Sequence, residues 1–237
     1  MKKAIILTIT FLTFQLGSAQ ETAEFFTKSD VFFKKYVAQG KVAYTAIKNN
    51  PSLLNELLDM ASAIKVSKSS PKTFQAFYIN AYNLAVIKGV IANYPIKSPL
   101  DVKGFFDTKT YLISGKKTTL NGIENEILRK NFPNEARFHF VLVCAGLGCP
   151  PIINSAYTPD KLSGQLQRQT VKSLNNPNFI KVSGSEVKLS QIFEWYKGDF
   201  TKKGSEIAYI NTYRKEKIPT SLKVSYYPYD WKLNISK

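Results

Sequence analysis

The hydrophobic pattern of the chain changes repeatedly between the 3.6-residue period of helices and the two-residue period of strands. Apolar side chains recur at helical spacing from Thr22 to Gln39 and again from Pro51 to Ile64. The intervening stretch from Lys41 to Ile47 predicts an extended segment. We therefore expect residues 20–64 to form an N-terminal helical annex.

The segment from Pro71 to Tyr94 is apolar nearly all round, which predicts a central, buried helix. Ser70 stands at the N-cap position, and a proline suits the first helical position. Two polar exceptions, Asn80 and Asn83, lie three residues apart and so share one face. A buried amide left unpaired costs about 1–3 kcal/mol. The two asparagines are therefore expected either to anchor neighbouring backbone or to line a binding pocket.

The run of aromatic and β-branched residues from Phe138 to Cys144 predicts a buried central strand that ends in a glycine-rich turn. On a regular strand His139 points to the opposite face from Cys144. We therefore expect Cys149, carried back by the turn over residues 145–148, to be the better-placed partner of His139. A contact between His139 and Cys144 would require a bulge.

Shorter elements fill the rest of the chain, and they mix helices with hairpins. The pattern predicts hairpins over 110–120 and 179–189, helices over 121–131, 158–175, 191–200 and 206–214, and a strand within 221–234. This irregular mixture indicates an α+β fold. We expect a single main domain over residues 71–237, with a central strand or small sheet packed on the buried helix.

Residues 1–19 have the composition of a secretory signal peptide. They contain two lysines, then an apolar stretch, then small residues at a cleavage-like site. The apolar run is shorter than the roughly 20 residues that a membrane-spanning helix needs. We therefore expect an exported protein that is soluble in the periplasm or outside the cell after the signal peptide is removed.

The protein is strongly basic, with 33 lysines and arginines against 17 acidic residues and a net charge of +16. The lysines are scattered, which favours either a solvated surface or attraction to an anionic envelope polymer or lipid surface. Nucleic acid is not the expected partner, because export and the lack of an aromatic-interleaved basic motif argue against it. The remaining candidate ligand is a small molecule or peptide.

Candidate chemistry is concentrated in RFHFVLVCAGLGCPP, residues 137–151, which holds the only histidine and both cysteines. In one interpretation this is a thiol-dependent hydrolase or acyl transferase acting on amide bonds of peptides or envelope material. Cys149 or Cys144 would be the nucleophile and His139 its base, with Glu124 or Asn80 orienting the imidazole. Backbone N–H groups of the glycine-rich turn would form an oxyanion hole.

Two other interpretations fit the same residues. An even number of cysteines in an oxidising compartment favours a Cys144–Cys149 disulfide in a non-catalytic binding or structural module. Metal or redox chemistry fits less well, because the spacing matches no familiar zinc motif and CAGLGC is not a C-x-x-C sequence. We expect no metal and no cofactor.

Several separated motifs together resemble bacterial members of domain-of-unknown-function family 547. They are AFYINAYN, GIENEILR, RFHFVLVCAGLGCPPI with the downstream AYT, LSQIFEWYKGDF and YDWKLN, and they span Lys72 to Asn234. The family has no established function, so the resemblance implies a fold and a motif set but no reaction. The positions that it marks are Asn80, Asn83, Glu124, His139, Cys144 and Cys149.

Overall fold

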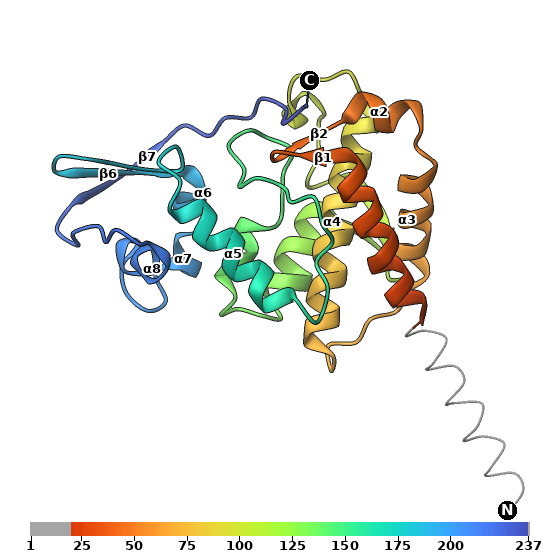
Figure 1. Ribbon diagram of the computed structural model, residues 1–237, viewed down its shortest axis with the longest axis horizontal. Helices are drawn as coiled ribbons and strands as arrows, with labels where there is room; N and C mark the ends of the chain where they lie inside the picture. The colour runs from red at the N-terminus through yellow and green to blue at the C-terminus, as the bar shows by residue number, and fades with distance from the viewer. Residues whose placement is uncertain (1–19, 237) are drawn as a thin grey trace, which may run out of the picture.

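Helices make up about half of the molecule, and small antiparallel or mixed sheets lie around them (Figure 1). The computed structural model describes residues 20–236, so the predicted signal peptide lies outside the described residues. This arrangement confirms the α+β class. Within the described range, no helix combines the length and the apolar character needed to cross a membrane.

The N-terminal part is helical over residues 20–36 and continues into a small hairpin and two further helices. These elements are β1 (Val37–Ala38), β2 (Lys41–Val42), α2 (Tyr44–Asn49) and α3 (Ser52–Ala63). The expectation that residues 41–47 are extended holds only for β2 and is wrong beyond it. Tyr44 and Ile47 lie three residues apart and are both buried, so burial on one face favours the helix α2 over an extended chain.

The predicted central helix is confirmed as α4 (Pro71–Asn93). In Figure 1 it lies between the N-terminal helices and the teal helix α5 (Leu162–Leu174). Nearly every side chain from Phe74 to Ile91 is buried, which explains why its sequence has no polar face. Ser70 precedes the helix, but its side chain forms no capping hydrogen bond.

The remaining elements follow the predicted order of hairpins and short helices. They are η1 (Pro99–Asp101), β3 (Thr110–Ile113), β4 (Lys116–Thr119), η2 (Gly122–Arg129), η3 (Ala136–Phe140), β5 (Ile180–Ser183), β6 (Glu186–Ser190), α6 (Gln191–Trp195), α7 (Lys197–Phe200), α8 (Glu206–Tyr213) and β7 (Lys223–Tyr227). β3 pairs with β4 and β5 with β6 in antiparallel hairpins, while β7 adds to β6 in parallel. The η2 segment is a π-helix, and η1 and η3 are 3₁₀ turns.

The predicted central strand over Phe138 to Cys144 is wrong. Its first residues form the 3₁₀ turn η3, and the chain then continues irregularly. The amide of Asn83 takes the place of a neighbouring strand: its Nδ2 donates to the carbonyl of Val141 at 3.0 Å, and the Val143 N–H donates to its Oδ1 at 2.9 Å. The apolar run is therefore buried and hydrogen-bonded without belonging to a sheet.

The helix expected from residue 158 begins later, at Leu162. Gln165 holds the preceding chain out of the helix, because its Nε2 donates to the carbonyl of Ala156 and its Oε1 accepts from the Thr158 N–H. The Thr158 carbonyl accepts from the Lys161 N–H at 3.1 Å, so residues 158–161 form a tight turn before the α-helical hydrogen bonds of α5 begin.

The C-terminal segment crosses the molecule and ends beside the β1–β2 hairpin (Figure 1). Asn234 joins the C-terminal segment to two distant parts of the chain. Its carbonyl accepts from the Val42 N–H at 2.9 Å and its side chain accepts from the Tyr44 hydroxyl at 2.7 Å, while its N–H donates to the Ala145 carbonyl at 2.8 Å. The cysteine loop is thus held by residues that follow it by more than eighty positions.

Candidate functional site

A pocket of about 460 Å³ lies where α4, η2, η3, α6, the cysteine loop and the C-terminal segment meet. Its walls are rich in aromatic side chains, including Tyr82, Trp195, Tyr196, Tyr229 and Trp231. Four of the sequence-predicted residues line it: Glu124, His139, Cys144 and Cys149. A pocket of this size suits a small ligand.

His139 lies in the wall of the pocket between two carboxylates. Its Nε2 is 2.9 Å from Oδ2 of Asp199, and its Nδ1 is 3.7 Å from Oε1 of Glu124. The ring stacks on Tyr196 with centroids 4.0 Å apart, and only 1% of the side chain is exposed. Within residues 20–236, no hydrogen bond joins His139 to the sulfur of either cysteine.

Asp199 comes from α7 and also binds Arg129, whose Nε lies 2.7 Å from its Oδ2. Burial would raise the pKa of Asp199, but hydrogen bonds from His139 and Arg129 outweigh it, so the pKa lies well below its usual range. Asp199 is therefore ionised at neutral pH and fixes the orientation of the imidazole.

Glu124 is almost fully buried at the pocket floor and interacts with Tyr196. Burial raises the pKa of the Tyr196 hydroxyl, and the neighbouring carboxylate of Glu124 raises it further. Tyr196 therefore stays protonated and can donate a hydrogen bond to Glu124. The guanidinium of Arg129 lies over the Tyr196 ring, 4.7 Å from its centroid.

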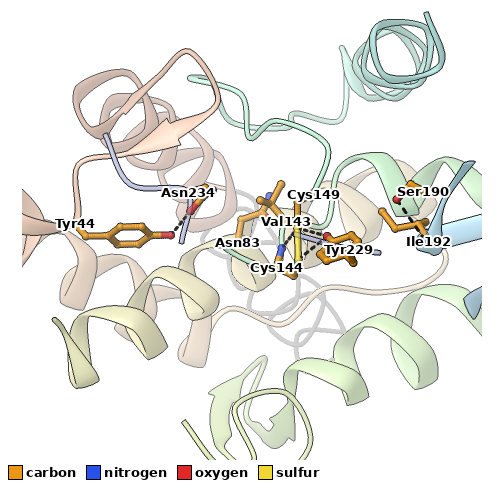
Figure 2. Close-up of a disulfide and its surroundings, with 9 residues drawn as sticks. All are labelled: Tyr44, Asn83, Val143, Cys144, Cys149, Ser190, Ile192, Tyr229 and Asn234. Carbon is orange, nitrogen blue, oxygen red and sulfur yellow. Dashed lines mark hydrogen bonds between the residues drawn. A yellow bond between two sulfur atoms is a disulfide. The ribbon is translucent and has the colours of Figure 1, made fainter. Parts of the chain in front are cut away.

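The two cysteines are joined as a disulfide in another part of the pocket wall (Figure 2). The hydroxyl of Tyr229 lies 2.9 Å from both sulfur atoms, and the backbone N–H of Cys144 donates to Sγ of Cys149 at 2.9 Å. Burial raises the pKa of Tyr229 well above its usual range, so its hydroxyl keeps its proton.

Asn80 and Asn83 bind backbone and are not among the residues that line the pocket. Asn80 donates to the carbonyls of Ala76 and Tyr157 and accepts from the Tyr157 N–H. Figure 2 shows Asn83 directed at Val143, beside the disulfide. Both amides therefore position the chain that forms the site.

The sequence did not point to Asp199, Arg129, Tyr196 or Tyr229 as parts of the site. Asp199 lies 60 residues from His139, and no local periodicity signals such a contact. The only available signal was that all four lie within the resemblance motifs: Arg129 ends GIENEILR, Tyr196 and Asp199 belong to LSQIFEWYKGDF, and Tyr229 begins YDWKLN. In the described part of the chain, no group of three or more histidine, cysteine or acidic side chains is arranged to hold a metal ion.

The fold and the pocket together define an α+β domain in which a buried histidine–carboxylate cluster and a disulfide face one aromatic-walled cavity. A family model described as "Protein of unknown function, DUF547" matches residues 66–174 of the chain. The matched segment includes α4, Glu124, His139 and both cysteines. Neither the curated proteins nor the solved structures gave a match to the chain.

Proposed function

We propose that this protein is an exported, non-catalytic binding module whose pocket takes a small ligand with a flat apolar face. The observation that carries the proposal is that the groups suited to nucleophilic catalysis are already engaged. The sulfurs are paired with each other, and both ring nitrogens of His139 face carboxylates. The disulfide then acts as a clasp in the pocket wall.

The exposed apolar side chains at the mouth of the pocket favour a ligand with a flat face. Leu100 and Trp195 are 54% and 46% exposed, which is unusual for large apolar side chains that share one pocket. The ring of Trp195 lies nearly parallel to that of Trp231, with centroids 5.9 Å apart and 26° between the planes. Such a surface favours stacking with a planar group, while Lys103, Asp107 and Asn121 offer polar contacts at the rim.

Intrinsic fluorescence tests the proposal directly, because the protein has two tryptophans and both line the pocket. We would titrate the protein with aromatic amino acids, aromatic dipeptides and envelope-derived oligosaccharides. The proposal expects at least one of these probes to change the emission saturably. Absence of any saturable change across the whole set would contradict it.

Two variants locate the binding that the titration detects. Trp195→Ala should weaken the binding of a responding probe about tenfold, the effect of losing about 1.4 kcal/mol of stacking and burial. Leu112→Ala removes an apolar side chain of comparable exposure from the β3–β4 hairpin and should leave the affinity unchanged. Equal losses in the two variants would place the binding elsewhere.

The basic charge favours residence of this module at an anionic envelope polymer or lipid surface. Co-sedimentation with vesicles containing an anionic lipid should decrease steeply between about 50 and about 500 mM salt, because salt screens the attraction between exposed charges. Retention that is independent of salt would contradict simple electrostatic attraction.

A thiol-dependent hydrolase or acyl transferase acting on amide bonds is the second candidate. It is favoured by one observation: Glu124, His139 and both sulfurs surround the same pocket. After reduction of the native protein, this candidate expects one cysteine to be alkylated rapidly at mildly acidic pH, and His139→Ala to abolish that reactivity. Labelling that is slow, or equal with and without His139, would exclude it.

A further inference from the structure

The two sulfurs of the disulfide have different surroundings. Both line the pocket, but Cys144 is half-buried whereas Cys149 is only 9% exposed. A thiol that enters the pocket therefore has better access to Sγ of Cys144. This matters because disulfide exchange depends on which sulfur can be approached.

The donors at the disulfide favour Cys149 as the sulfur that carries negative charge. Its Sγ accepts from the backbone N–H of Cys144 at 2.9 Å, a bond that Sγ of Cys144 does not receive (Figure 2). The Tyr229 hydroxyl lies 2.9 Å from both sulfurs, so it can donate to the Cys149 thiolate when the pair opens. Hydrogen bonds to a thiolate stabilise it and lower the thiol pKa, and a leaving sulfur of lower pKa leaves faster. Because Tyr229 is buried and keeps its proton, it remains a donor at neutral pH.

The loop that carries the cysteines is held by backbone hydrogen bonds as well as by the disulfide. Backbone hydrogen bonds join it to the C-terminal segment: Gly148 N–H to Asp230 at 2.7 Å, Leu147 N–H to Lys232 at 2.8 Å, and Asn234 N–H to Ala145 at 2.8 Å. By chain entropy, a disulfide that closes so small a ring contributes about 2 kcal/mol, and the backbone bonds remain when it opens. The pair can therefore open and close while the pocket keeps its shape.

From these observations we infer a further activity: the Cys144–Cys149 disulfide exchanges with a small dithiol bound in the pocket, with Cys144 as the attacked sulfur and Cys149 as the leaving thiolate. This activity goes beyond the proposed binding role. It rests on the positions of the hydrogen-bond donors at the disulfide, and it does not depend on which dithiol binds.

The exchange is balanced in two steps. A thiolate of the dithiol forms a bond to Sγ of Cys144, the Cys144–Cys149 bond breaks, and its electron pair goes to Sγ of Cys149. The second thiolate of the ligand then attacks the ligand sulfur of this mixed disulfide and releases Cys144. The dithiol is oxidised by two electrons to a disulfide, the protein pair is reduced, and the two protons pass through solvent to the cysteines.

The attacked sulfur can be identified in the full-length native protein. We would add 2-mercaptoethanol, quench with N-ethylmaleimide and locate both adducts by fragmentation mass spectrometry. The inference expects the mercaptoethanol adduct on Cys144 and the maleimide on Cys149. An adduct mainly on Cys149, or a pair that reacts only after denaturation, would overturn it.

The contribution of the Tyr229 hydroxyl can be measured as a shift in the midpoint potential of the pair, using dithiothreitol redox buffers. Tyr229→Phe should make reduction about tenfold less favourable, which lowers the potential by about 30 mV. The matched control is Tyr111→Phe, because the Tyr111 hydroxyl has no hydrogen-bond partner in the described structure and lies outside this pocket. Equal potentials in the two variants would overturn the assignment of Tyr229 as a donor to the leaving thiolate.

Discussion

Asn83 is the residue on which the cysteine segment depends most directly. It is 2% exposed, and its amide bonds both the carbonyl of Val141 and the N–H of Val143. These two backbone groups are buried in a segment that has no strand partner. One side chain on α4 therefore sets the course of the chain that leads from His139 to Cys144.

Replacing Asn83 by alanine should destabilise the protein by about 2–4 kcal/mol, because two buried backbone groups lose their partners. Urea unfolding measures this change. Asn93→Ala is the control on the same helix: the Asn93 amide bonds only the carbonyl of Gly89 within α4, and its loss should cost less than about 1 kcal/mol. Equal costs would show that the Val141–Val143 segment does not need the amide.

Asp199 should make the stability of the protein sensitive to acid. Its pKa is depressed in the folded state by the hydrogen bonds from His139 and Arg129 that overcome burial. A depressed pKa contributes stability that is present above the unfolded value of about 3.9 and is lost as the pH falls below it.

The corresponding experiment compares stability at pH values from 6 down to about 2, the range that contains the unfolded aspartate pKa. Asp199→Asn should be less stable than the wild type at pH 6 and should lose less stability on acidification. The control Asp59→Asn changes an exposed carboxylate that forms no ion pair within residues 20–236, and it should follow the wild type. If the free energy of unfolding of Asp199→Asn falls with pH as steeply as that of the wild type, this carboxylate is not coupled to folding.

At the scale of elements, α4 organises the core, and its boundaries could be predicted from the sequence. The apolar run, Pro71 at the start and Pro95 beyond the end are local signals, and they located the helix to within one residue. The hairpins β3–β4 and β5–β6 could be predicted for the same reason, because their turns carry Gly115 and Gly184 in positive-φ conformations.

The prediction that failed was the central strand from Phe138 to Cys144, and it shows what local sequence patterns cannot determine. A short apolar run is compatible with a strand or with any other buried segment, and only its hydrogen-bond partners distinguish these possibilities. Here the partner is the side chain of Asn83, about 60 residues earlier. The candidate residues Glu124, His139, Cys144 and Cys149 were predicted as a set, but the approach of Asp199 to the histidine depends on tertiary contacts.

Gly89 lets α4 pack closely against Tyr111 of β3 and against Phe105. A Cβ atom at this position would lie 2.7 Å from the hydroxyl of Tyr111 and 2.9 Å from ring atoms of Phe105, which lines the pocket. Gly89→Ala should therefore destabilise the protein by about 1–3 kcal/mol through overpacking, despite the better helix propensity of alanine.

Thermal unfolding measures the effect of Gly89→Ala, and Gly164→Ala in α5 is the matched control. At Gly164 a Cβ atom would approach only the mobile end of the Arg168 side chain, so the helix propensity of alanine should dominate and leave stability unchanged or higher. A stabilising effect at Gly89 as well would show that α4 and Phe105 can move apart without cost.

At the scale of the whole molecule, contacts from both ends of the described chain meet around α4. Phe25 packs on Phe77 with ring centroids 5.2 Å apart, and the Tyr44 hydroxyl donates to Asn234 at 2.7 Å in a buried site. The division into an annex over residues 20–64 and a main domain stays a prediction. These contacts favour unfolding as one cooperative unit.

Calorimetry of the chain without its first nineteen residues should therefore show a single transition, with equal calorimetric and van't Hoff enthalpies. Asn234→Ala should lower the free energy of unfolding by about 1–3 kcal/mol, because the Tyr44 hydroxyl is left buried without its acceptor. The whole transition should then move to lower temperature. The double variant with Tyr44→Phe should cost less than the two single changes added together. Two separate transitions would instead support an independent annex.

We conclude that Cys144 and Cys149 form a disulfide in the wall of the aromatic-walled pocket, so that the resting protein presents no free thiol. The most direct test of this claim is mass spectrometry of the native protein after alkylation without reductant. We expect that neither cysteine is alkylated until a reductant is added, and that both are alkylated afterwards. Alkylation of either cysteine in the native, unreduced protein would contradict the claim.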